Sequence, residues 1–156
     1  MEVDERTDES VYEAHAAELV RFATGLVGVD DAPDVVVEAF VRVIRSPVWA
    51  EARDRRALWL RAVVFESRSM VRSSARRRER ERRVAVPALA PDESSVVDTN
   101  VVDALDRLSV QQRAVVMLTY WMDLTPSSIA ELLEVSEGSV RKQLARARAR
   151  MKEALS

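Results

Sequence analysis

The stretch SIAELLEVSEGSVRKQL, Ser128–Leu144, changes character at its midpoint, because its only charges after Glu137 are basic. Its apolar residues have the spacing of two short crossing helices that share a small junction: Ile129, Ala130, Leu133, Val135, Val140 and Leu144. Ser136 is placed to cap the second helix, since a serine side chain accepts a hydrogen bond from an amide of the first turn. The stretch therefore predicts a helix-turn-helix.

The turn of this motif contains an unusual residue. Glu134 stands where a glycine would adopt a left-handed conformation without a Cβ penalty. We therefore expect a turn that is strained by about 1 kcal/mol, or one that bends differently.

The last helix is predicted to have one apolar and one basic face, at about 100° per residue. The inward stripe contains Val140, Leu144, Ala147 and Met151, and the opposite face contains Gly138, Lys142, Ala145 and Ala149, with Arg141 and Arg146 beside it. Small residues let the backbone approach a polyanion, while the flanking cations reach its phosphates. The pattern favours a DNA-binding helix over the alternative, a solvated basic helix end that complements the helix dipole.

The residues before this motif continue the helical pattern. VVDALDRL, residues 101–108, predicts a short helix, and Ser109 with Gln112 forms a capping box for a helix over residues 110–122. Thr125, followed by proline, is a typical helix start and begins the first helix of the motif. The C-terminal half is thus predicted to contain four helices.

A linker is predicted before this half. VAVPALAPDESSVVDTN, residues 84–100, has two prolines, no apolar periodicity and clustered small polar residues. The chain is therefore expected to form two small helical domains, residues 1–83 and 101–156, joined by a flexible linker.

Three helices are predicted in the N-terminal half. Apolar residues recur at helical spacing over residues 10–27 and 33–45, and Asp54 is placed to cap a long third helix with no breaker before the linker. Only three glycines and five prolines leave few turns for a many-stranded sheet. The fold class is therefore predicted to be all-α.

Composition excludes several classes of function. The chain has no cysteine, which removes disulfides, thiolate zinc sites and thiol catalysis. Its acidic N-terminus is no secretory signal, and its apolar runs are interrupted long before the ~20 residues that a membrane span needs. No constellation of nucleophile, metal ligands or phosphate loop indicates an enzyme. We expect a cytoplasmic protein with no cofactor, no metal and no membrane insertion.

The net charge of −2 conceals a strong segregation of charge. Residues 1–50 contain 4 basic and 11 acidic side chains, whereas residues 68–83 contain eight arginines and two glutamates. Residues 141–152 contain six basic side chains and no acid. An acidic front and two basic stretches indicate more than one partner.

The chain resembles the extracytoplasmic-function class of bacterial sigma factors over nearly its whole length. LDRLSVQQRAVVMLTYWMDLTPSSIAELLEVSEGSVRKQLARARARMKEAL, residues 105–155, is similar to sigma domain 4. ELVRFATGLVGVDDAPDVVVEAFVRVI, residues 18–44, and WLRAVVFESRSMVRSSARRR, residues 59–78, are similar to sigma domain 2. The resemblance implies a non-catalytic subunit that binds core RNA polymerase, through the beta-prime clamp and the beta flap, and directs it to promoter DNA. An anti-sigma factor is a further implied partner.

The resemblance also implies sets of functional residues. The upstream (−35) promoter element would be contacted by Glu137, Ser139, Arg141, Lys142 and Arg146, with Arg148 and Arg150 holding backbone or polymerase. The downstream (−10) region would be contacted by Arg68, Arg72, Arg76 and Arg77. RNA polymerase would be contacted by Asp34, Glu38 and Phe40, although Phe40 could instead be an ordinary core residue. The loop over residues 46–54 lies where relatives capture an unstacked base, which requires a pocket.

The chain departs from the family on the promoter-facing helix. Relatives have an Arg-Asn pair and then an aspartate, where this chain has Phe65, Glu66 and Met70. An exposed Glu66 would repel phosphate, so downstream recognition is expected to be unusual, weak or dependent on a second protein. These departures leave two alternatives open: a sigma-like decoy or adaptor that binds an anti-sigma factor, and a stand-alone helix-turn-helix regulator. The tryptophans Trp49, Trp59 and Trp121 are all expected in the core.

Overall fold

The computed structural model describes residues 7–83 and 104–155, and every regular element within these ranges is an α-helix. The predicted all-α fold is therefore confirmed. The predicted linker over residues 84–100 lies outside the described residues, so the domain boundaries stay a prediction. In the described part of the chain, no helix combines the length and the apolar character needed to cross a bilayer.

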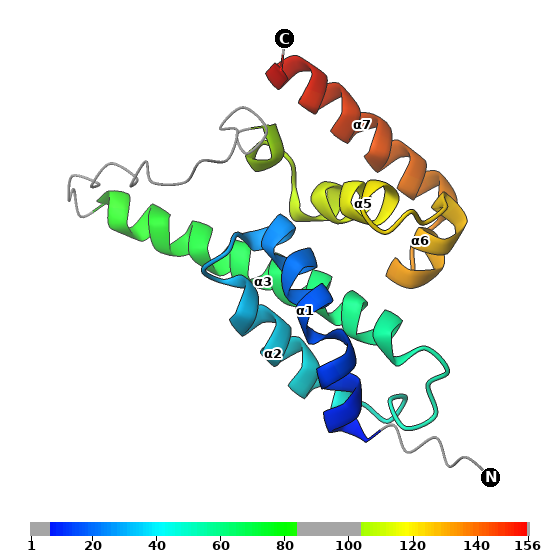
Figure 1. Ribbon diagram of the computed structural model, residues 1–156. Coiled ribbons are helices and arrows are strands. Elements are labelled where there is room, and N and C mark those ends of the chain that lie inside the picture. Colours follow the sequence, from blue (N-terminus) through cyan, green and yellow to red (C-terminus); the bar gives the residue numbers. More distant parts are fainter. Residues whose placement is uncertain (1–6, 84–103, 156) are drawn as a thin grey trace.

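The N-terminal half consists of α1 (Asp8–Val27), α2 (Ala32–Ile44) and α3 (Arg55–Arg83), packed side by side (Figure 1). The start of each helix follows from its sequence. The Thr7 side chain accepts a hydrogen bond from an amide in the first turn of α1, at 3.1 Å, and Asp54 does the same for α3, at 2.9 Å. Proline lies in the first turn of α2. Asp54 is thus confirmed as the cap of the long third helix.

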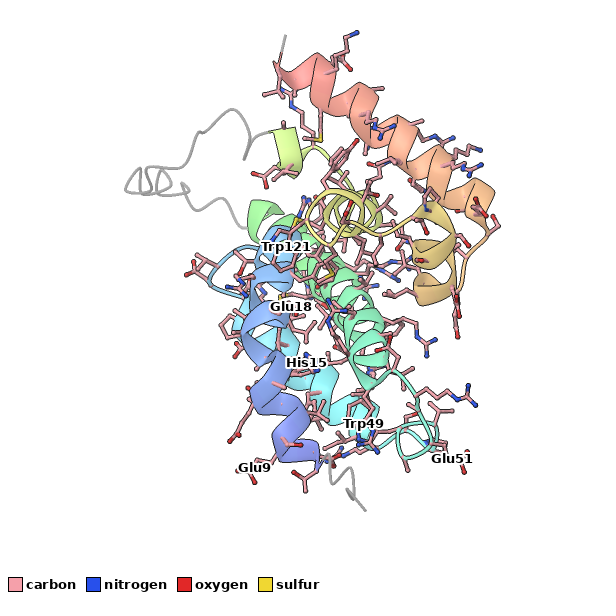
Figure 2. All side chains as sticks on the ribbon, turned by 45° about the vertical axis from the view of Figure 1, so that its right-hand side comes forward. Glu9, His15, Glu18, Trp49, Glu51 and Trp121 are labelled. Carbon is pink, nitrogen blue, oxygen red and sulfur yellow. The ribbon has the colours of Figure 1, made fainter. Side chains whose placement is uncertain are left out.

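An aromatic cluster fills the core of this half. Trp59 is fully buried, and its indole nitrogen donates to the Val36 carbonyl at 3.1 Å, which satisfies its only polar atom. Its ring centroid lies 4.8 Å from that of Phe40 and 5.5 Å from that of Tyr12. Trp49, which donates to Asp8 at the first turn of α1, is also buried (Figure 2). The core assignments of Trp49 and Trp59 are confirmed.

The core assignment of Trp121 is wrong. Its side chain is 42% exposed, because it follows the last residue of α5 and only part of the indole is covered by the rest of the molecule. An aromatic residue at a helix end therefore needs a neighbouring element to bury it, and the sequence pattern alone does not reveal whether that neighbour is present.

The C-terminal half consists of α5 (Val110–Tyr120), α6 (Pro126–Leu133) and α7 (Glu137–Leu155), preceded by a helical turn over residues 104–106. The predicted capping box at Ser109 is present, with both hydrogen bonds to Gln112, at 3.1 and 3.2 Å. Thr125 and Ser136 cap α6 and α7 through hydrogen bonds of 3.1 and 3.0 Å from backbone amides. The predicted helix starts are confirmed, whereas α5 ends at Tyr120, two residues early.

The two halves pack against each other, with α1 and α3 on one side and α5 and α6 on the other. Gly25 of α1 leaves room for Met117 of α5, because a Cβ at residue 25 would lie 2.8 Å from the Met117 terminal methyl carbon. Arg113 of α5 donates at 2.6 Å to the carbonyl of Leu26, in the last turn of α1, where backbone acceptors lack helical partners. Burial lowers the pKa of Arg113, and the charge of Asp106 acts in the opposite direction.

Candidate nucleic-acid interface

The helix-turn-helix is formed by α6 and α7, and Glu134 lies between them in the left-handed region at φ 56° and ψ 45°. The amide of Val135 donates to the Ala130 carbonyl at 3.0 Å, which closes the end of α6 in the manner usually associated with glycine. Of the two expected conformations, the strained left-handed turn is therefore the one adopted. Glu134 also pairs with Arg61 of α3, a contact that joins the motif to the N-terminal half.

The apolar stripe of α7 is confirmed in the structure. Val140, Leu144 and Ala147 are buried and Met151 is half-buried. Helix α7 packs on α5 and α6, and in Figure 1 it lies on their far side from α1, α2 and α3. The opposite face of α7 is therefore directed away from the rest of the described structure.

The predicted DNA-contacting residues of α7 occur together on this outer side. Glu137, Arg141, Lys142 and Arg146 are exposed, and Ser139 is half-buried. Arg141 pairs with Glu137 one turn earlier, with nitrogen and oxygen 2.6 Å apart. Such an exposed pair contributes at most about 1 kcal/mol, so the guanidinium is released at little cost. The face combines exposed cations with the small residues Gly138, Ala145 and Ala149.

Two further arginines of α7 are used within the molecule. Arg148 donates to the Tyr120 hydroxyl at 2.6 Å, and Arg150 donates to the Gln112 side chain at 3.1 Å. Tyr120 and Gln112 both belong to α5, so both contacts connect α7 to α5. Arg148 and Arg150 therefore have partners within the molecule, and their expected contact with backbone or polymerase stays a prediction.

Helix α3 carries the second group of predicted residues. Arg68, Arg72, Arg76 and Arg77 are all exposed. Closer to the start of the helix, Arg56 donates from Nε to Glu18 of α1 at 2.8 Å, and Arg61 pairs with Glu134. The cations of α3 are thus divided: the first ones are engaged within the molecule and the later ones face outward.

The atypical Glu66 has an intramolecular partner that the sequence did not suggest. Its side chain is only 12% exposed, and Arg42 of α2 places Nε 2.6 Å from its carboxylate. The same guanidinium lies over the ring of Phe65, with its carbon 4.5 Å from the ring centroid. The concern that Glu66 would repel phosphate is therefore removed, because its charge is covered and neutralised. The contact joins α2 and α3, so spacing along the sequence did not reveal it.

The predicted polymerase-contacting residues of α2 do not share one environment. Asp34 and Glu38 are exposed, whereas Phe40 is half-buried and its ring packs in the aromatic cluster with Trp59. Val37 and Val41, to which the sequence assigned no polymerase contact, are exposed between and beyond the two acids. The outer surface of α2 therefore combines acidic and aliphatic side chains, and Phe40 contributes mainly to the core.

The side chain of Trp49, in the loop over residues 46–54, is not accessible to a ligand. Trp49 is 4% exposed. Its ring centroid lies 6.0 Å from the centroid of Phe40 and 5.2 Å from the guanidinium carbon of Arg55.

Within the described residues, no group of His, Asp or Glu side chains is arranged to hold a metal ion.

Comparisons with known proteins agree with these features. Residues 99–151 match the family model described as Sigma-70, region 4. The sigma factor SigL of Mycobacterium tuberculosis, described as an ECF RNA polymerase sigma factor, is 33% identical over 148 residues, which cover 86% of this chain and 81% of SigL. These values hold for SigL of the strains Erdman, CDC 1551 and H37Rv.

A solved structure shares the fold. It is the sigma factor RpoE from Bartonella quintana, in complex with the anti-sigma factor NepR, with a TM-score of 0.67, 22% identity and coverage of 94% of this chain and 95% of that one. The chain belongs to the extracytoplasmic-function (ECF) sigma factors of RNA polymerase, which direct transcription.

Proposed function

We propose that the chain binds core RNA polymerase and directs it to promoters by placing α7 in the major groove of the upstream (−35) element. The observation that carries the proposal is the outer face of α7, where exposed cations flank small residues opposite a buried apolar stripe. Residues near the start of a recognition helix face base edges, and later cations meet phosphates. Arg141 and Lys142 are assigned to bases, and Arg146 to the backbone.

The exposed arginines of α3 are assigned to the downstream region. Arg68, Arg72 and Arg76 recur at intervals of four residues, so they form one cationic line along the helix. Phosphate contacts of this kind position a protein on DNA without reading sequence. Arg77 lies beside the line and extends the positive surface.

The outer surface of α2 is assigned to the polymerase. Asp34 and Glu38 are exposed acids with the aliphatic side chains of Val37 and Val41 between and beyond them. Complementary charge around an apolar centre is a favourable arrangement for a protein interface. The beta-prime clamp is the proposed partner of this surface, and the beta flap that of the C-terminal half.

Use of both promoter elements requires the two halves to separate. Helices α5 and α6 cover one side of α1 and α3, and Glu134 holds Arg61 of α3. We assign this packed arrangement to the free protein and an extended one to the polymerase-bound protein. The contacts that must be lost include the Arg61–Glu134 pair, the Arg113 hydrogen bond to Leu26 and the packing of Met117 on Gly25. The apolar packing of α5 and α6 on α1 and α3 must be lost with them.

An anti-sigma factor is a further proposed partner. The Bartonella relative was solved with one, and a regulator that holds the halves together would keep the chain inactive. A chain that bound such a regulator but supported no transcription would instead be a decoy. The covered charge of Glu66 weakens one reason for that alternative.

Run-off transcription with core polymerase on a fragmented genomic library of the host tests the proposal. The expected result is a set of transcript starts preceded by a shared upstream motif, absent with core polymerase alone. Core binding without any transcript would favour the decoy, whereas duplex binding without core binding would favour a stand-alone regulator.

A further inference from the structure

Two methionine side chains lie where the halves of the chain pack together. Met117 of α5 contacts Gly25 of α1: the three atoms nearest to the position of a Cβ on residue 25 all belong to Met117, and the sulfur lies 2.9 Å from that position. Met122 follows the end of α5, and its sulfur lies 3.9 Å from Nη2 of Arg56 on α3. Both thioethers therefore pack against the N-terminal half.

A thioether in such a place is open to a specific chemical change. The sulfur of methionine attacks one oxygen of a peroxide, so that a sulfur–oxygen bond forms and the oxygen–oxygen bond breaks. The leaving hydroxide takes the proton of the transferred oxygen and departs as water. The sulfur loses two electrons and the peroxide gains them. The apolar side chain becomes a polar sulfoxide, and the chain has no cysteine that would compete for the oxidant.

The hydrogen-bond donors that flank Met117 are already engaged. Each nitrogen of the Arg113 guanidinium, one turn earlier on α5, donates to a backbone carbonyl. The Thr24 hydroxyl, beside Gly25, donates to the Val20 carbonyl at 2.7 Å. Met117 is half-buried against the hydrophobic core, so a small oxidant can reach it. A sulfoxide oxygen there would compete with existing hydrogen bonds, whereas separation of the two surfaces would let water solvate it.

Met122 has the opposite surroundings, although it lies at the same interface. Its sulfur is already within reach of the Arg56 guanidinium, which also pairs with Glu18 of α1. A sulfoxide oxygen at Met122 would accept a charge-assisted hydrogen bond from Arg56. Oxidation of Met122 is therefore expected to keep the halves together, and oxidation of Met117 to separate them.

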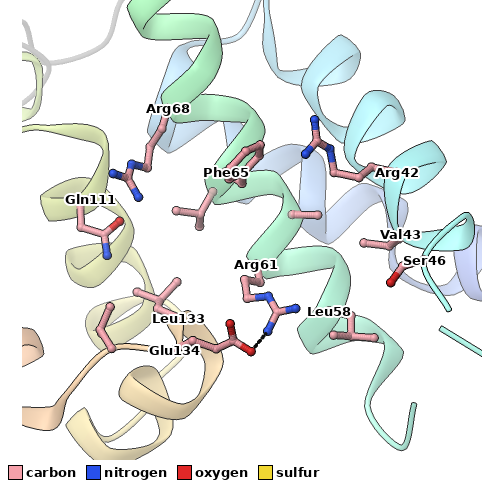
Figure 3. Close-up of a pocket in the computed structure, with 13 residues that line it drawn as sticks. Arg42, Val43, Ser46, Leu58, Arg61, Phe65, Arg68, Gln111, Leu133 and Glu134 are labelled. Carbon is pink, nitrogen blue, oxygen red and sulfur yellow. Dashed lines mark hydrogen bonds and ion pairs between the residues drawn. The ribbon is translucent and has the colours of Figure 1, made fainter. Parts of the chain in front are cut away.

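The apolar contacts between the halves matter more than their ion pair. Arg61 of α3 pairs with Glu134 at the helix-turn-helix (Figure 3), and both side chains are well exposed. Exposed ion pairs contribute little to stability. The packing of α5 and α6 on α1 and α3 therefore depends mainly on apolar side chains, to which Met117 belongs.

We propose that Met117 is a site of reversible oxidation by peroxides, and that its sulfoxide separates the two halves of the chain. Methionine sulfoxide reductases would restore the thioether and the packed arrangement. This inference rests on the proposed function, in which separation of the halves allows both promoter elements to be used. Oxidation of Met117 would thus activate the protein.

Energy transfer between two dyes tests the proposal on the full-length protein. Because the chain has no cysteine, Val48→Cys with Glu131→Cys provides two specific labelling positions, and both residues are exposed. They lie near Ser46 and Glu134 in the sequence, which line one cavity between the halves (Figure 3). Single-molecule measurements count packed molecules, with high transfer, and separated ones, with low transfer.

The labelled protein is treated with hydrogen peroxide, and mass spectrometry of its peptides reports the sulfoxide at each methionine. The ratio of separated to packed molecules should rise by about 5- to 150-fold, the range expected for one buried polar group without a partner. Reduction by methionine sulfoxide reductases should reverse the rise. Met117→Leu, which conserves volume, should abolish it, whereas Met122→Leu should leave it unchanged.

A second variant needs no oxidant. Met117→Gln places a polar amide in the contact with Gly25, so its halves should be separated before any treatment. Packed halves in this variant would overturn the proposal, and so would an equal response of Met117→Leu and wild type to peroxide. The proposal also fails if Met117 stays unoxidised while Met122 is converted, or if the untreated wild type is already separated.

Transcription with core polymerase distinguishes this proposal from the proposed function. Oxidised wild type should give more transcript than the reduced protein, and Met117→Leu should give equal amounts in both states. Separation on oxidation with no gain in transcript would support the modification site and count against the proposed need for separation.

Discussion

Helices α3 and α7 are both rich in arginine, yet they use their charge differently. In α7 the exposed cations gather on one outer face, and the arginines near the end of the helix hold it to α5. In α3 the order is reversed: Arg56 and Arg61 near the start are held by acids, and the later arginines are exposed. A count of charges gives the two helices the same description, and only the partners of each side chain separate structural from binding roles.

The two helices are also anchored by different side chains. The buried part of α3 is held by Trp59 within an aromatic cluster and by the aliphatic Leu60, Val63 and Val64, all near the start of the helix. Helix α7 is held by the smaller Val140, Leu144 and Ala147, which recur at intervals of three or four residues.

The largest expected effect is therefore on the anchor of α3. We expect Trp59→Ala to lower the free energy of unfolding by about 3–5 kcal/mol, because it removes a fully buried indole and leaves a cavity. Urea denaturation of the purified variant measures the change. Trp121→Ala is the matched control. It should lower the free energy of unfolding by less than about 1 kcal/mol, because much of the Trp121 ring is already exposed. Equal losses would contradict the assignment of Trp121 to the surface.

The second prediction concerns the outer face of α7. Arg141→Ala and Lys142→Ala should each weaken use of the upstream element by about 1–3 kcal/mol if the side chains contact bases, and should relax preference at one base pair. Transcription from a library of upstream sequences measures both effects. Lys152→Gln, in the last turn of the same helix and beyond the proposed base contacts, should leave the preference unchanged. Unaltered promoter output from both variants would refute their assignment.

The third prediction concerns the exposed arginines of α3, which are proposed to contact phosphates, in contrast to the proposed base contacts of α7. Arg72→Ala should weaken promoter binding almost equally for all sequences and reduce the slope of log affinity against log salt by about 1, because it removes one phosphate contact. Binding titrations at several salt concentrations give the slope. Arg56→Ala is the control on the same helix, since Glu18 already holds its guanidinium. A sequence-dependent loss for Arg72→Ala would show that α3 reads bases there.

The smallest effect is expected at the turn of the helix-turn-helix. Glu134→Gly removes a left-handed strain of about 1 kcal/mol and loses an exposed ion pair worth about 0–1 kcal/mol. Unfolding free energy should therefore stay level or rise by up to ~1 kcal/mol. Ser73→Gly, in the interior of α3, should instead lower it by about 0.5–1 kcal/mol. If both variants lost stability equally, the ion pair and not the strain would dominate at residue 134.

Local features of the fold were predictable from the sequence because they depend on neighbours along the chain. The caps at Asp54, Ser109, Thr125 and Ser136 and the buried stripe of α7 follow from spacing of three or four residues. The left-handed turn at Glu134 was one of two expected conformations. These features require no knowledge of which helices are adjacent in space.

Features that depend on distant residues were not predictable in the same way. The pairing of Glu66 with Arg42, and of Glu134 with Arg61, joins residues from different helices. Gly25 lies within α1 and makes room for Met117 of α5, a contact between the two halves of the chain. The packing of the two halves was likewise not anticipated, because the predicted linker suggested independent domains. The candidate site on two helices stays a prediction, and the partners that divide its charges required the structure.

The central claim is that α3 and α7 are used at the same time, which requires the packed halves to separate. The chain has no cysteine, so Gly25→Cys with Met117→Cys introduces one specific disulfide. A Cβ at residue 25 would lie 3.3 Å from Cγ of Met117, the atom whose place a cysteine sulfur would take, so the two introduced side chains would be in direct contact. Run-off transcription by the oxidised and reduced double variant, with each single variant as a control, is the most direct test. The account predicts loss of transcript on oxidation and recovery on reduction, whereas equal transcription in both states would contradict it.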